Sequence, residues 1–71
     1  MVLRYFFTVA DDVAVFADSE GQSFESSDAA IAHARKVARE LASDGTHYSG
    51  YVVVVTDEQG RELARIPVLA Q

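Results

Sequence analysis

The sequence predicts an α+β fold with the element order β-β-α-β-β, in which a four-stranded antiparallel sheet carries one helix on one of its faces. Three observations predict this fold. Four stretches are rich in aromatic and β-branched residues, an alanine-rich stretch with helical periodicity lies between the second and third of them, and the connections within each pair are short. Short connections join antiparallel neighbours, so we expect one hairpin on each side of the helix. The 71 residues are expected to form one small globular domain, 1–71.

The first predicted hairpin opens the chain. The stretches "LRYFFTVA" (3–10) and "VAVFA" (13–17) are separated only by "DD", which is too short for anything but an antiparallel connection. After a polar turn, "QSFE" (22–25) is predicted to be a short extended piece that leads into the helix.

The helix is the most clearly marked element. The stretch "DAAIAHARKVARELAS" (28–43) has high helix propensity, and Ser26 or Ser27 can serve as its N-cap. Asp28 suits the first turn, and Gly45 suits the C-terminal cap. At about 100° per residue, one face is apolar and is expected to pack on the sheet. Its members are Ala30, Ile31, Ala34, Val37, Ala38, Leu41 and Ala42.

The second predicted hairpin joins "GYVVVVT" (50–56) to "RELARIPVL" (61–69) through "DEQG". Pro67 cannot donate a ladder hydrogen bond, so the last strand is expected at an edge of the sheet.

Two turns share one pattern, "DSEG" (18–21) and "DEQG" (57–60). An aspartate that begins a turn can accept hydrogen bonds from the following backbone, and glycine supplies the positive φ that closes the turn. A calcium loop needs about six oxygen ligands, more than either stretch offers. We therefore interpret both stretches as turns and expect no metal site there.

Composition limits the classes of partner. The chain has no cysteine and a formal net charge of −5, and 49% of its residues are hydrophobic. This acidic balance disfavours nucleic acid as a partner, because phosphate binding needs an excess of Lys and Arg. The longest apolar run, "YVVVV", is far too short to span a membrane. We expect a soluble, cytoplasmic protein.

Alternation along the strands divides the predicted sheet into two faces. The more apolar sets are expected to face the helix: Leu3, Tyr5, Phe7 and Val9; Tyr51, Val53 and Val55; and Ala64, Ile66 and Val68. The outer face is then expected to carry Arg4, Phe6, Val52, Val54, Leu63 and Arg65. Either Phe16 or Val13 and Val15 would join it.

The outer face is the candidate interaction surface, because the strand 50–56 is apolar on both sides whereas a one-sided sheet alternates. Three uses stay open. The face is ordinary surface with tolerated apolar residues, or it packs against a second copy or a protein partner. In the third, it is a small-ligand or nucleic-acid platform, on which Phe6 stacks and Arg4 and Arg65 bind an anion.

We expect no catalytic, cofactor or metal site. His33 and His47 lack a metal-ligand spacing, and no serine lies in a nucleophile-elbow context. Arg35, Lys36 and Arg39 form a basic stripe on the helix. We interpret it as the solvated back of an amphipathic helix, with contact to an acidic partner or RNA as the alternative.

The segments "RYFF", "DSEG", "SDAAIAHARKVARELA" and "GYVVVVTDEQGRELARIP" resemble a family of short bacterial proteins, common in rhizobia and related proteobacteria, known as a domain of unknown function. The resemblance covers essentially the whole chain and departs at "ADD", where a glycine-containing turn is expected. It implies a fold and brings no catalytic residue. More distantly, the first half resembles the antitoxin half of small RNA-targeting toxin–antitoxin pairs.

The sequence thus favours a non-enzymatic protein-interaction module that self-associates through its sheet or binds another protein. The alternatives are a small nucleic-acid or ligand-binding domain and an antitoxin-like regulator.

Overall fold

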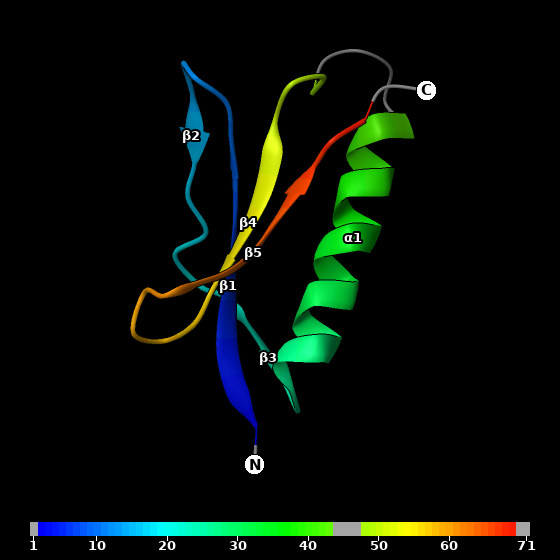
Figure 1. The fold of residues 1–71 in the computed structure, drawn as a ribbon. Helices are drawn as coiled ribbons and strands as arrows, with labels where there is room; N and C mark the ends of the chain where they lie inside the picture. The colour runs from blue at the N-terminus through cyan, green and yellow to red at the C-terminus, as the bar shows by residue number, and fades with distance from the viewer. Residues whose placement is uncertain (1, 44–47, 70–71) are drawn as a thin grey trace.

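The computed structural model describes residues 2–43 and 48–69, which form five strands and one helix (Figure 1). The elements are β1 (Leu3–Ala10), β2 (Val15–Phe16), β3 (Gln22–Phe24), α1 (Ser27–Ser43), β4 (Val52–Thr56) and β5 (Glu62–Pro67). The predicted α+β class and the strands–helix–strands order are confirmed. The sheet has five strands rather than four, because the short piece before the helix is itself a strand.

The sheet is antiparallel throughout, with the order β2-β1-β4-β5 and with β3 also paired to β1. Strands β2 and β3 lie along the same side of β1, one after the other: Val9 pairs with Phe16, and Tyr5 pairs with Gln22. The predicted second strand, 13–17, is therefore only two residues long, because the chain leaves β1 after Phe16 and returns at Gln22. The first hairpin itself is present, and its turn is held by Asp11, whose carboxylate Oδ1 accepts the N–H groups of Val13 and Ala14.

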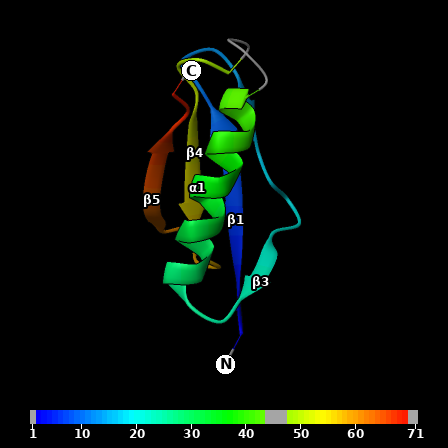
Figure 2. The ribbon, with the colours of Figure 1, turned by 90° about the vertical axis from the view of Figure 1, so that its right-hand side faces the viewer.

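Helix α1 covers one face of the sheet, with β5 on one side of it and β1 and β3 on the other (Figure 2). Ser26 is the N-cap, because its Oγ accepts the N–H of Ala29 over 3.1 Å. The fully buried helix residues are Ala30, Ala34, Ala38 and Ala42, one turn apart, so side chains of minimal size face the sheet. Val37 and Leu41 flank this stripe and pack against the core, as the periodicity predicts, and Ile31 is half-buried. Gly45, the predicted C-cap, lies outside the described residues.

The core lies between α1 and the sheet. Its buried sheet residues are Tyr5, Val53, Val55 and Val68, and the half-buried Phe7, Val9, Ala64 and Ile66 pack against them. These residues belong to the sets that alternation assigned to the helix side. Among the described residues, strand β5 lies at one edge of the sheet, as Pro67 predicts.

Candidate interaction surfaces

The outer face of the sheet is the first candidate surface. Cross-strand partners point to the same side of a sheet, so the register places Phe6, Thr8 and Ala10 of β1 beside Thr56, Val54 and Val52 of β4. Arg65 and Pro67 of β5 follow, opposite Val54 and Val52. We call the apolar centre of this face, Phe6, Ala10, Val52 and Val54, the outer patch. All four residues are half-buried, and α1, the helix of the described residues, lies on the other face.

The two arginines predicted on this face already have partners within the chain. Arg65 donates Nε and Nη2 to the carboxylate of Glu62, over 3.1 and 2.8 Å. This pairing raises the pKa of Arg65 and lowers that of Glu62. Arg4 donates Nη1 to the carbonyl oxygen of Glu20, 2.7 Å away. Arg65 is thus paired with a carboxylate, and one N–H of Arg4 is bonded within the chain, which weakens the argument for an anion site between them.

Leu63 does not lie on the outer face. Thr56 pairs with Glu62 but Val55 pairs with Ala64, so Leu63 has no partner on β4 and the alternation of β5 is broken there. Leu63 instead lines a shallow hollow with Leu3, Tyr5 and Ser27, at the N-terminal end of α1. The assignment from simple alternation was wrong at this residue because a register shift cannot be seen in the spacing of apolar residues.

The register between β1 and β2 determines which residues of the second strand lie on the outer face. Val15 pairs with Ala10 and so joins the outer face, whereas Phe16 pairs with Val9 and lies 6.1 Å from Tyr51, centroid to centroid, in a stacked arrangement. Val13 lies in the turn and is 93% exposed.

The turn that begins at Asp18 is a compact hydrogen-bonded unit. Its Oδ1 accepts the N–H groups of Glu20 and Gly21, and its Oδ2 accepts the N–H of Phe7. Partial burial alone would raise the pKa of Asp18, but these three N–H groups and the nearby Arg4 together hold that pKa below its ordinary value. The carboxylate is a structural acceptor, as the turn interpretation requires.

The turn that begins at Asp57 uses the same chemistry. Oδ1 accepts the N–H groups of Gln59 and Arg61, and Oδ2 accepts Nε–H of Arg61. The bond from the Arg61 backbone is the main cause that lowers the pKa of Asp57. Gly60 has a φ of +80°, the left-handed conformation that glycine adopts without cost. The repeated Asp-x-x-Gly pattern is therefore shared turn chemistry.

His33 lies against the sheet rather than near other metal-ligating groups. Its ring centroid is 5.1 Å from that of Phe7 and 5.3 Å from that of Phe24. Within residues 2–43 and 48–69, no three His, Cys, Asp or Glu residues are grouped closely enough to hold a metal ion. His47 lies outside the described residues. Among the described residues, no helix is both long and apolar enough to cross a bilayer.

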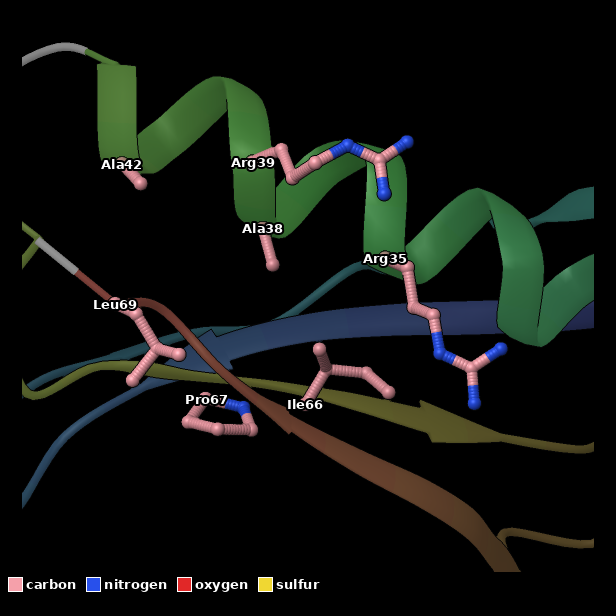
Figure 3. A pocket seen from close by; sticks show the side chains of 7 residues that line it. All are labelled: Arg35, Ala38, Arg39, Ala42, Ile66, Pro67 and Leu69. Carbon is pink, nitrogen blue, oxygen red and sulfur yellow. The ribbon is translucent and has the colours of Figure 1, made fainter. Parts of the chain in front are cut away.

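The second candidate surface is a groove between α1 and β5, with a volume of about 290 Å³ (Figure 3). Ala38 and Ala42 point from the helix toward the strand, and Ile66 points back from β5 toward the helix. Pro67 and Leu69 complete the apolar lining. Arg35 and Arg39 stand at the helix side of the groove, and Arg35 reaches toward β5. Two members of the basic stripe therefore border an apolar hollow, which the helical spacing alone did not show.

Comparison with known proteins gives a family and no activity. A family model described as a domain of unknown function, DUF6894, matches residues 4–70. No curated protein and no solved structure matches the chain. Because the match extends from the first strand of the sheet to beyond the last, the chain belongs to the DUF6894 family.

Proposed function

We propose that this protein is a non-enzymatic interaction module that pairs with a second copy of itself through the outer face of its sheet. The observation that carries the proposal is the outer patch, in which Ala10 pairs with Val52 across β1 and β4. Val54 and Phe6 lie further along the same face, where their cross-strand partners are Thr8 and Thr56. A sheet with apolar residues on both faces is stabilised when each face is covered by another layer. Among the described residues, α1 covers one face and leaves the outer face open (Figure 2).

The size of the molecule makes such pairing effective. A typical interface buries about 800 Å² per partner. That is about one sixth of this chain's accessible surface of 4751 Å². Each patch side chain that becomes fully buried contributes up to about 1.5–3 kcal/mol, against association costs of about 4–15 kcal/mol. Several residues per copy must therefore act together, which their position on one face of two neighbouring strands allows.

Charges on the outer face fit the same proposal. Glu62 and Arg65 neutralise each other at the edge of the patch, so this pair brings no net charge against an apolar surface when two copies approach. Facing sheets of this kind pack with their strands about 30° apart.

Sedimentation velocity tests the proposal. We expect a dimer that persists at high salt, because apolar contacts are not screened. Val54→Lys should give a monomer, whereas Val13→Lys, the same change in an exposed turn, should leave the dimer intact. Circular dichroism would establish that both variants are folded. A wild-type protein that stays monomeric over a wide concentration range would overturn the self-association proposal.

Two other proposals rest on different outcomes. RNA binding that weakens steeply with salt and is lost in Phe6→Ala would favour the nucleic-acid platform. A toxin gene beside the gene for this protein would favour an antitoxin-like regulator. The hydrogen bonds already made by Arg4 and Arg65 favour the apolar interface over the first of these.

We also propose that the protein works in the cytoplasm of a proteobacterium of the rhizobial type. The resemblance of its segments to short proteins of those bacteria supports this source. Fractionation of such cells, followed by detection with an antibody, would test the location, and recovery from the periplasm would contradict it.

A further inference from the structure

The groove between α1 and β5 combines three features that point to one kind of ligand, independently of the outer patch. Much of its lining is apolar, its helix side carries two arginines, and its other side is β5, whose outer edge has no strand partner among the described residues. The groove opens beside the edge of β5, whereas the outer patch is centred on β1 and β4. Dimer formation and binding in the groove can therefore be measured separately.

The charge at the groove calls for an anion. Arg35 and Arg39 are four residues apart on one helix, a spacing at which like charges repel. Among the described residues, no carboxylate oxygen lies within 4 Å of either guanidinium, although the chain as a whole carries a net charge of −5. A local cationic site in an acidic protein is favourable when a carboxylate-bearing partner occupies it.

The edge of β5 presents backbone groups to which an extended peptide could hydrogen-bond. The N–H of Val68 donates to Tyr51, on the β4 side, so alternation directs the N–H and C=O of Arg65 toward the free edge. Pro67 points the same way and offers only its carbonyl, so its missing N–H costs no bond within the sheet. An added strand would find a donor and an acceptor at Arg65 and a further acceptor at Pro67.

The distance between the two arginines along α1 is close to the distance between alternate residues of an extended strand. Residues two apart on a strand point to the same side and lie about 6.8 Å apart. Arg35 and Arg39 are separated by about 6 Å along the helix axis. A strand paired at Arg65 would therefore present its two neighbouring helix-side positions to the two arginines. Its next helix-side position would lie toward Ala42 and Leu69, the apolar end of the groove.

We propose that this groove binds an extended acidic peptide by strand addition to β5. The peptide carries two carboxylate residues two positions apart, which pair with Arg39 and Arg35. An apolar residue two positions before them fills the end of the groove at Ala42 and Leu69. The strand runs antiparallel to β5, and the residue between the two acids exchanges backbone hydrogen bonds with Arg65.

Fluorescence anisotropy with a labelled, end-blocked peptide, Thr-Leu-Thr-Glu-Thr-Glu-Thr, tests this proposal. We expect saturable binding that weakens with salt. Arg35→Ala and Arg39→Ala should each weaken binding about tenfold. Lys36→Ala removes the same charge from the same helix but not from the groove lining, so it should change the affinity less than about twofold. An isomer with adjacent glutamates, which point to opposite sides of a strand, should bind much more weakly.

Backbone pairing has its own test. Methylation of the central threonine nitrogen, between the two glutamates, removes the donor that would meet Arg65 and should abolish binding. Equal binding of the methylated peptide would overturn strand addition, and equal losses in Lys36→Ala and Arg39→Ala would overturn the groove as the site. A failure to bind the unmodified peptide at low salt would overturn the proposal as a whole. Sedimentation of Arg39→Ala should match wild type, which separates this result from the proposed dimer.

Discussion

The carboxylate of Asp18 accepts a hydrogen bond from the backbone N–H of Phe7, 3.1 Å away, at the point where the partner of β1 changes from β2 to β3. Phe7 lies midway between Tyr5, which pairs with β3, and Val9, which pairs with β2. Its N–H would lack a strand partner there. The Asp18 side chain takes the place of a strand carbonyl and keeps the ladder continuous across the break.

Asp18→Asn should therefore lower the free energy of unfolding by about 1–2 kcal/mol, because the amide has one acceptor oxygen where the carboxylate shares two among three N–H groups. Urea unfolding followed by circular dichroism would measure the change. Asp12→Asn, the same substitution at an exposed residue of the neighbouring turn, should stay within about 0.5 kcal/mol of wild type. Equal effects of the two substitutions would contradict a bridging role for Asp18.

Low pH should destabilise the fold, because it protonates Asp18 and the other carboxylates that accept hydrogen bonds in the folded chain. The folded-state pKa is lowered at Asp11, Asp18, Asp57 and Glu62 by hydrogen bonds to their ionised forms. A lowered folded pKa means that the unfolded chain binds protons first, so this stability is complete above the unfolded pKa, about 4, and is lost as the pH falls through the folded values. The urea concentration at the midpoint of unfolding should therefore decrease as the pH falls below about 4. Asp18→Asn should flatten that fall, and an unchanged slope would show that Asp18 does not contribute.

Two glycines that share a positive φ should differ in how much their substitution by alanine destabilises the fold. Gly21 has a φ of +71°, and a Cβ there would meet Phe6 Cε1 and the Tyr5 carbonyl oxygen at 2.8 Å. Gly60 has a φ of +80°, but a Cβ there would meet nothing within 4 Å. Gly60→Ala should cost about 1–2 kcal/mol for the left-handed conformation alone. Gly21→Ala should cost more, because rigid backbone at Tyr5 as well as the Phe6 ring must shift.

Thermal unfolding of the two glycine variants gives the comparison directly, since the conformational cost is common to both. The difference in melting temperature between them measures how closely the Asp18 turn packs on β1. Equal melting temperatures would show that the turn moves freely away from Phe6 and Tyr5.

Residue periodicity and the position of proline in the sequence predicted the buried helix face and the sheet edge, but not the short strand β3. The period of Ala30, Ala34, Ala38 and Ala42 identified the buried helix face, because a helix over a sheet presents one stripe. Strand β3 was predicted only as an extended piece, because three residues carry too little alternation to reveal a partner. Pro67 signalled the sheet edge, since its missing donor is tolerated only there.

The candidate surfaces were predictable in part. Alternation assigned Phe6, Val52 and Val54 to the outer face, and it failed at Leu63 because a register shift adds a residue to β5 without leaving a pattern. The helix stripe of Arg35 and Arg39 was visible, but the groove beside it depends on how α1 sits over Ile66. Two signals in the sequence bear on this site: the basic stripe, for which contact with an acidic partner was one alternative, and Pro67, which indicated the edge of the sheet.

The alanine stripe of α1 sets how closely the helix approaches the sheet, and enlarging it should destabilise the fold. Ala34 is fully buried against the sheet, whereas Ala32 is exposed on the same helix. Ala34→Leu adds three carbons to a packed interface and should lower the free energy of unfolding by about 1–3 kcal/mol or more. Ala32→Leu introduces the same side chain into water and should change it by less than about 0.5 kcal/mol.

Urea unfolding of this pair separates packing from helix propensity, because both substitutions place leucine in the middle of α1. The displaced helix in Ala34→Leu should also open the groove between α1 and β5, so this variant should bind the acidic peptide more weakly while Ala32→Leu binds it as wild type does. A stable Ala34→Leu protein would show that α1 is held loosely over β4. The flanking residues Val37 and Leu41, which pack against the core, would then supply most of the helix–sheet stability.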